Sequence, residues 1–319
     1  MDSPTMLARE IKKRGLRWTK QDTLDFFGVS SAQDITWGHA INSRDELDSV
    51  LRGDGHIMFL ESDVRMGTCG ECENLPIMAH PPATQSDLTF DNYLQDIVHH
   101  NRTMTDSSRR VGIKLDFKDA AALRPCLIRL REVLGEEELK FPVWLNADIF
   151  WGPAGKQPAI DPESFLRECA GLFPSGTLSP GFTTGPCFKD PVEAAERLIT
   201  DQELVLGYSK THLQVAERLL GDDLGHVTLP LQSTMMRVGG NNVVEFLQRH
   251  PDYTVTLWGE QSEEDAAWLA STHELQGRIF LDVKTPGVET IGLNLAPELF
   301  NLAKRGLVLV GMSGVVSAD

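Results

Sequence analysis

Residues 111–134 read VGIKLDFKDAAALRPCLIRLREVL, and this stretch decides the fold. Its first part, 111–117, is a strand-like run in which Lys114 and Asp116 alternate with apolar residues. Its second part, 119–134, has the apolar spacing of an amphipathic helix. A strand that passes directly into a helix is the repeating unit of a parallel α/β sheet. The same unit recurs on both sides of this stretch.

Eight strand–helix units are predicted. The strands are expected at 35–41, 56–64, 111–117, 142–149, 176–183, 226–233, 253–259 and 278–283. The helices are expected at 43–52, 89–101, 119–134, 162–172, 191–220, 241–250, 262–275 and near 296–304. Eight units in about 280 residues fit a closed (β/α)8 TIM barrel, and no GxGxxG motif supports a dinucleotide-binding sheet. We expect one α/β barrel domain over residues 33–319, preceded by an N-terminal helical extension over residues 1–32.

The composition is that of an ordinary globular protein: 319 residues, 41% hydrophobic and 24% charged, with a net charge of −16. It excludes disordered, collagen-like and coiled-coil chains. No apolar run reaches the roughly 18 residues of a transmembrane segment. The negative charge disfavours a long basic groove for nucleic acid, but it is compatible with one small phosphate-bearing substrate.

Five cysteines and no evident secretory leader predict a reducing, cytoplasmic location. Cys69 and Cys72 form a CxxC pair with no second pair and no histidine at zinc spacing. Three interpretations stand: a zinc site, a disulfide within the loop, and two ordinary loop thiols. The last is favoured.

The polar residues of the predicted strands gather at the C-terminal strand ends, where the active sites of TIM barrels lie. They are His39 on the first strand, Glu61 and Asp63 on the second, Lys114, Asp116 and Lys118 on the third, Asn146 and Asp148 on the fourth, and Asp282 and Lys284 at the end of the eighth. Side chains alternate along a strand, so Glu61 and Asp63 share one face. Lys114, Asp116 and Lys118 likewise share one.

Three of these residues, Glu61, Asp63 and Asp116, offer the hard oxygen ligands that Mg²⁺ and Ca²⁺ prefer. The alternative is an internal salt-bridge network without a metal ion, because buried charges must be paired in either case. His39 closes the first strand, and His80 follows in a long connection before Pro81-Pro82. Two histidines beside a metal site make an acid–base pair, since imidazole titrates near neutrality.

The order His39, Glu61-x-Asp63, His80, Asp116-x-Lys118 resembles the catalytic layout of the PLC-like phosphodiesterase superfamily, which includes glycerophosphodiester phosphodiesterases and sphingomyelinase D. A closer resemblance is to the menorin family, a branch of that superfamily, in its short, soluble, single-domain form. The runs that carry it are ITW at 35–37, PIMAHPPAT at 76–84, GIKLDFK at 112–118 and PVWLNAD at 142–148. One departure is Gln232, where members tend to carry an arginine that Arg237 would have to replace.

The resemblance implies a metal-dependent phosphodiesterase. Glu61, Asp63 and Asp116 would hold one Mg²⁺ or Ca²⁺, one of His39 and His80 would act as the base and the other as the acid, and Lys118 would neutralise phosphate charge. The residues expected at the substrate are Asn42, Lys114, Asn146, Asp148 and Trp258, of which Asn42, Asn146 and Asp148 would orient either the substrate or the inner shell of the metal. Trp37 and Trp144 would line the mouth of the barrel or pack in its core.

The expected substrate is a small or terminal phosphodiester of the glycerophosphodiester or lysophospholipid type. One alternative is a nuclease that acts on RNA or DNA ends. Another is a non-enzymatic binding module on a phosphodiesterase scaffold. No protein partner is predicted.

Overall fold

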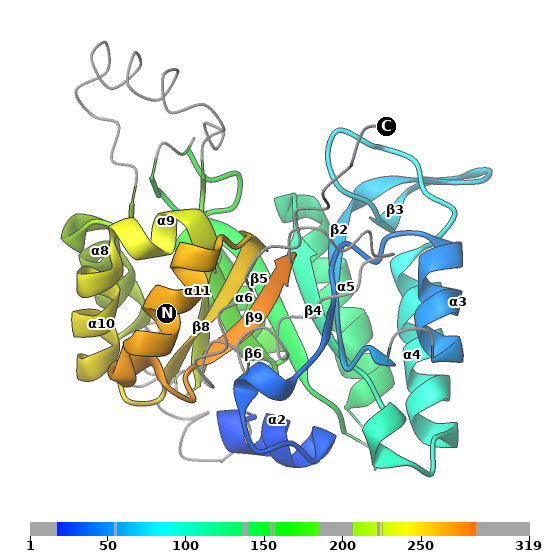
Figure 1. The fold of residues 1–319 in the computed structure, drawn as a ribbon. Coiled ribbons are helices and arrows are strands. Elements are labelled where there is room, and N and C mark those ends of the chain that lie inside the picture. The colour runs from blue at the N-terminus through cyan, green and yellow to red at the C-terminus, as the bar shows by residue number, and fades with distance from the viewer. Residues whose placement is uncertain are drawn as a thin grey trace, which may run out of the picture.

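A nearly closed barrel of eight parallel strands, flanked by helices, forms the core of the computed structural model (Figure 1). The strands are β1 (Trp37–Gly38), β2 (Phe59–Cys69), β4 (Gly112–Phe117), β5 (Val143–Phe150), β6 (Thr177–Phe182), β7 (Val227–Gln232), β8 (Tyr253–Glu260) and β9 (Ile279–Lys284). Each strand pairs in parallel with the next, and β9 lies beside β1. The predicted TIM-barrel architecture is confirmed.

The structure describes residues 18–53, 56–135, 140–153, 155, 157–184, 207–221, 224 and 226–284. The helix predicted near 296–304, residues 191–206 of the helix predicted over 191–220, and residues 1–17 of the predicted extension lie outside these ranges.

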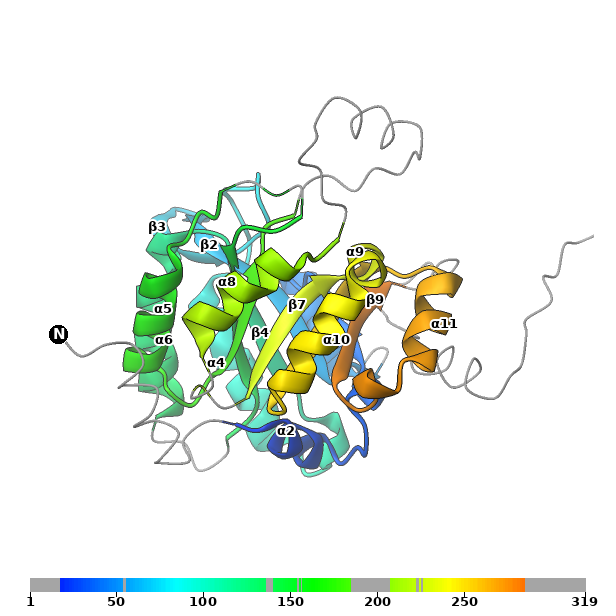
Figure 2. The ribbon, with the colours of Figure 1, turned by 90° about the vertical axis from the view of Figure 1, so that its left-hand side faces the viewer.

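Helices cover the outside of the barrel (Figure 2). They are α3 (Arg44–Arg52), α4 (Phe90–Thr103), α5 (Ala120–Leu134), α6 (Pro162–Leu172), α8 (Lys210–Leu220), α10 (Gly240–Arg249) and α11 (Glu263–Ser271). Most of these helices begin within a residue or two of the predicted start. The start is marked in the sequence by a Ser, Thr or Asp whose side chain accepts a hydrogen bond from the first helical turn, as Ser43, Thr89 and Asp119 do. None of the described helices is long and apolar enough to span a membrane.

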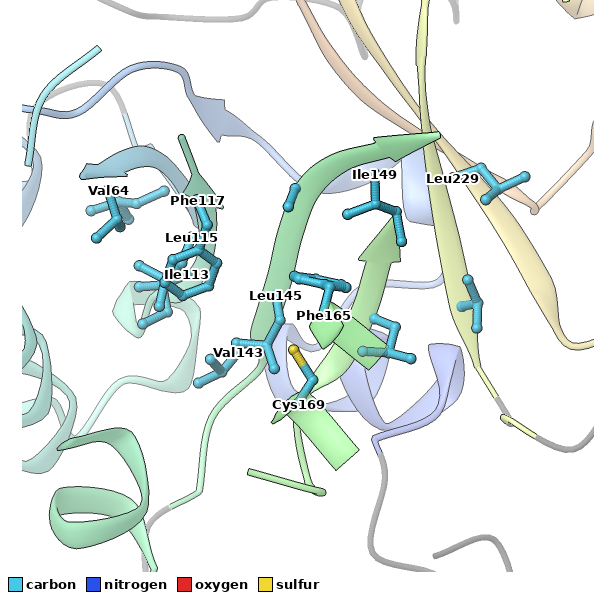
Figure 3. Close-up of a cluster of buried hydrophobic side chains, with 14 of the residues drawn as sticks. Val64, Ile113, Leu115, Phe117, Val143, Leu145, Ile149, Phe165, Cys169 and Leu229 are labelled. Atoms are coloured by element: carbon cyan, nitrogen blue, oxygen red, sulfur yellow. The ribbon is translucent and has the colours of Figure 1, made fainter. Parts of the chain in front are cut away.

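On β4, Ile113, Leu115 and Phe117 point outward into the apolar layer between the sheet and the helices (Figure 3). Lys114 and Asp116 alternate with them and face the barrel interior. Phe165 and Cys169 of α6 lie in the same layer. The core between sheet and helices is therefore continuous, and it fixes which strand residues face the barrel interior.

Aromatic rings fill the floor of the barrel. Trp37 stacks on Phe59 with ring centroids 4.5 Å apart, and Trp144 lies 4.5 Å from Phe59 and 4.8 Å from Phe280. Helix α2 (Lys20–Phe27) packs Phe27 against the same cluster, below the barrel in Figure 1. Both Trp37 and Trp144 are 0% exposed. They belong to the core and do not line the mouth.

Among the described residues, a strand and a short α-helix were not predicted. Strand β2 continues past the barrel to Cys69 and returns as the antiparallel strand β3 (Cys72–Met78), and the short helix α9 (Ser233–Val238) follows β7 directly. The outer half of β3 is exposed on both faces, so its sequence lacks the alternation of apolar and polar residues that predicts a strand.

The contribution of the aromatic floor to the stability of the fold can be tested by substitution. Replacing Trp144 by alanine leaves a large cavity in a fully buried cluster, so we expect Trp144→Ala to lower the free energy of unfolding by about 3–5 kcal/mol. The matched control is Trp151→Ala, since Trp151 is 58% exposed, and we expect its effect to stay within about 0.5 kcal/mol. Urea unfolding of both variants measures the difference. Equal losses would contradict a packed floor.

Candidate metal centre and acid–base site

The strand register brings the polar residues of β2, β4 and β5 together above the aromatic floor. Glu61 pairs with Lys114, Asp63 with Asp116, and Asp116 with Asn146. Registered residues of neighbouring parallel strands project from the same face of the sheet. The five side chains therefore gather inside the barrel, toward the C-terminal ends of the strands.

Three predicted metal ligands converge. Glu61, Asp63 and Asp116 each offer one carboxylate oxygen, and these oxygens lie within 4.8 Å of one another. Glu61 and Asp63 are only 3% exposed. Burial raises the pKa of Glu61 to about 7, while the charge of His39 opposes that shift. Buried carboxylate oxygens of this kind suit Mg²⁺ or Ca²⁺, so the residues fit the predicted cation.

Lys118 bridges two of those ligands. Its Nζ lies 3.0 Å from Asp63 Oδ1 and donates to Asp116 Oδ2 at 2.6 Å. Burial disfavours ionisation of Asp116, but the charges of Lys118 and Lys114 outweigh it and lower the pKa of Asp116. The ammonium group thus supplies part of the positive charge that these carboxylates need.

Asn42 orients Asp63. Its Nδ2 donates to Asp63 Oδ2 at 2.7 Å, and the backbone N–H of Asp63 donates to Asn42 Oδ1 at 2.8 Å. The reciprocal pair fixes the carboxylate on the opposite side from Lys118. In this structure Asn42 therefore orients a predicted metal ligand, which is one of the two roles expected of it.

His39 is held by two carboxylates. Its Nδ1 lies 2.9 Å from Asp282 Oδ1 and 3.5 Å from Glu61 Oε2. Asp282 is the main reason that the pKa of His39 rises to about 9; burial acts in the other direction, and Glu61 adds to the rise. The contact through Nδ1 leaves Nε2 as the ring nitrogen that can face a substrate.

Asp282 was not predicted as a site residue. It is 1% exposed, and its second oxygen, Oδ2, lies 3.5 Å from Nζ of Lys114. Lys114 is therefore a partner of Asp282 in the buried interior. The sequence signal for Asp282 was its place at the end of the last predicted strand, the same kind of position that singled out the other residues.

His80 lies at the rim of the barrel and is exposed. Its Nδ1 donates to the carbonyl of Pro81 at 2.7 Å, and the N–H of the preceding Ala79 donates to the carbonyl of Asp63 at 3.0 Å. Arg65 Nη1 donates to the carbonyl of Ala83 at 2.8 Å and fastens the same loop. His80 is thus anchored beside the strand that carries Asp63, while within the described residues its ring is bonded to Pro81.

The remaining predicted residues lie near the mouth. Asn146 is buried, accepts from Ser179 Oγ at 2.8 Å and hydrogen-bonds Asp116. Trp258 is half-buried and in register with Asp282. Burial by the surrounding protein is the main cause that raises the pKa of Asp148, and the charge of Asp116 adds to the rise. Because the Asp148 side chain is exposed to solvent at the mouth, water limits this effect of burial on its pKa.

Arg237 does not replace the arginine missing at position 232. Its Nε lies 2.8 Å from Asp265 and its Nη2 lies 3.2 Å from Glu264, both on helix α11. The guanidinium is therefore engaged on the outside of the barrel. Among the described residues, the cationic side chains in contact with the predicted metal ligands are Lys118, against Asp63 and Asp116, and His39, against Glu61.

Comparisons with known proteins match most of the chain. The Menorin N-terminal domain matches residues 31–286, a range that contains every predicted site residue. The human protein named "Protein FAM151B" is 32% identical over 257 residues, which cover 79% of this chain and 83% of that protein.

The environment of His39 predicts how stability depends on pH. Its pKa is raised from 6.5 to about 9 in the folded protein, so the stabilisation is complete below pH 6.5 and is lost as the pH rises to 9. With the side chain 27% exposed, we expect a loss on the order of 1–2 kcal/mol in protein kept metal-free with EDTA. Chemical denaturation across this pH range measures it. Asp282→Asn should remove most of the slope; an unchanged slope would contradict the assignment.

Lys118 gives a test of the metal centre. Removing its charge frees oxygens of Asp63 and Asp116, so we expect Lys118→Met to bind Mg²⁺ or Ca²⁺ several-fold more tightly than the wild type. Isothermal titration calorimetry measures the change. Lys210→Met is the control, because Lys210 is exposed on α8 and should leave the affinity unchanged. Weaker binding by Lys118→Met would argue against this site.

Proposed function

The chain belongs to the menorin family, and on that premise we propose that it is a metal-dependent phosphodiesterase. The observation that carries the proposal is the convergence of Glu61, Asp63 and Asp116 inside the C-terminal end of the barrel, with His39 beside Glu61. This is the end at which TIM barrels place their catalytic residues. A family and a fold leave the chemistry open, so the proposal rests on the site.

The three carboxylates would hold one Mg²⁺ or Ca²⁺. When bound, such a cation stabilises negative charge that develops on a phosphate oxygen. Lys118 lies against two of the same carboxylates, and we assign it to neutralising a second phosphate oxygen. Asn42 keeps Asp63 in place, and Asn146 does the same for Asp116.

The two histidines differ in their protonation. His39 carries a proton at neutral pH because Asp282 and Glu61 raise its pKa to about 9, so we assign it as the acid that protonates the leaving oxygen. His80 uses its Nδ1–H on the carbonyl of Pro81, which leaves a lone pair on Nε2 in the neutral ring. We assign His80 as the base that deprotonates the nucleophile.

The substrate we propose is a small or terminal phosphodiester of the glycerophosphodiester or lysophospholipid type. Among the described residues, the interior carboxylates contact two lysines, Lys114 and Lys118. A long polyanion would need a row of cations along its path. One phosphate held at a single point does not.

We also propose a cytoplasmic location. The described cysteines Cys69, Cys72 and Cys126 are free thiols. Free thiols are typical of a reducing compartment.

A hydrolysis screen tests the proposed activity. We expect turnover of at least one substrate among glycerophosphodiesters, lysophospholipids and short RNA in Mg²⁺ or Ca²⁺, and none in EDTA. His39→Ala should reduce the rate by about 10²–10⁴-fold, the usual contribution of a general acid. Asp116→Asn should abolish it by removing a ligand.

The control for that screen is Asp106→Asn, because Asp106 is an exposed carboxylate in the connection before β4. We expect its rate to equal that of the wild type. Identical background rates for all four proteins on every substrate would favour a non-enzymatic binding module. Activity confined to RNA ends would favour a nuclease.

A further inference from the structure

Two cysteines face each other at the tip of the β2–β3 hairpin. Cys69 and Cys72 are directly paired across the two strands, joined by the two-residue turn Gly70-Glu71. Gly70 has φ +59°, the left-handed conformation that such a tight turn requires. We propose that Cys69 and Cys72 form a reversible intramolecular disulfide, which makes the hairpin tip a redox-modified site.

The geometry of the pair suits a disulfide. Directly opposed residues of an antiparallel pair have Cα atoms about 4.5–5.5 Å apart and side chains on the same face. A disulfide bridges Cα atoms about 4.4–6.8 Å apart. The folded backbone therefore already holds the two residues at bonding distance. A sequence with one CxxC pair could not show this, because it does not reveal that the strands turn back between the cysteines.

Exposure makes the modification selective. Cys72 is exposed and Cys69 is half-buried, so a small oxidant can reach both. Cys126 and Cys169 are buried in the hydrophobic core. Burial also raises the pKa of the Cys126 thiol well above its ordinary value, which keeps the reactive thiolate scarce. Both buried cysteines serve as internal controls.

The oxidant is a low-molecular-weight disulfide such as oxidised glutathione. The thiolate of Cys72 attacks one of its sulfurs, which forms a mixed disulfide and releases one glutathione thiol. The thiolate of Cys69 then attacks the Cys72 sulfur and releases the second. The two cysteines lose two electrons and two protons, and oxidised glutathione gains them as two thiols.

The location of the pair gives the disulfide a structural effect. One residue before Cys69, the N–H of Thr68 donates to the carbonyl of Thr84 at 3.0 Å, and the N–H of Ser86 donates to the carbonyl of Thr68 at 3.1 Å. Gly67 permits this approach, because a Cβ there would lie 2.5 Å from the Thr84 carbonyl oxygen. A disulfide at the tip would therefore link β2 and β3 covalently beside the hydrogen bonds that hold the loop following His80.

The test equilibrates the full-length protein with buffers of reduced and oxidised glutathione, then alkylates all free thiols in denaturant at a pH that halts exchange and digests with trypsin. Both cysteines fall in the peptide 66–102, between Arg65 and Arg102. We expect that peptide to lose two hydrogens in oxidising buffer and to regain them with a dithiol reductant. Peptides that carry Cys126 and Cys169 should stay alkylated throughout.

Cys69→Ser is the decisive variant, because it removes the resolving thiol and should trap Cys72 as a mixed disulfide with glutathione, with no internal bond. Full alkylation of the wild-type peptide in every buffer, or a bond between two molecules, would overturn the proposal. Hydrogen exchange tests whether the disulfide stabilises this part of the hairpin: the amides of Thr68 and Ser86 should exchange more slowly in the oxidised protein. Equal exchange in both forms would overturn that part. None of these readouts depends on phosphodiesterase activity.

Discussion

The compensation of buried charge inside the barrel is the constraint on which the rest of this structure depends. Four carboxylates form ion pairs with three basic side chains. The carboxylates are those of Glu61, Asp63, Asp116 and Asp282, and the basic side chains are His39, Lys114 and Lys118. Buried charges are costly unless they are paired, and removing one partner leaves the other uncompensated. The strand register must therefore keep these groups in contact. The apolar floor below and the helices outside provide the packing that holds the register.

Most of the site could be predicted because strand periodicity is simple. Once 56–64 and 111–117 are read as neighbouring strands, alternation places Glu61, Asp63 and Asp116 on one face, and their convergence follows from the parallel pairing. Asp282 could not be assigned in this way. It is 243 residues from His39 in sequence, and the contact exists only because β9 lies beside β1 where the barrel closes. The sequence predicts that the barrel closes, but local patterns do not record which side chains meet where the first and last strands come together.

The sequence also does not show how far along the barrel axis an inward-facing side chain lies. Trp144 and Asn146 both face inward from β5, but the first packs in the floor and the second lies among the ligands. The stagger between strands sets this level, and it is fixed by the packing of the whole barrel. His80 illustrates a related point: its motif was recognisable, but its position at the rim depends on the unpredicted β2–β3 hairpin and on the bond from Ala79 to Asp63.

Lys118 connects the charge balance to function. In the folded chain its ammonium group lies between Asp63 and Asp116, the position of a counter-ion for two of the three converging carboxylates. A divalent cation on the same oxygens would take over that compensation and leave the lysine charge available for another anion. A phosphate diester carries such a charge and has oxygens for both cations. The site therefore needs no surplus of basic residues to bind phosphate, and a chain with a net charge of −16 can present one positively charged point inside an acidic barrel.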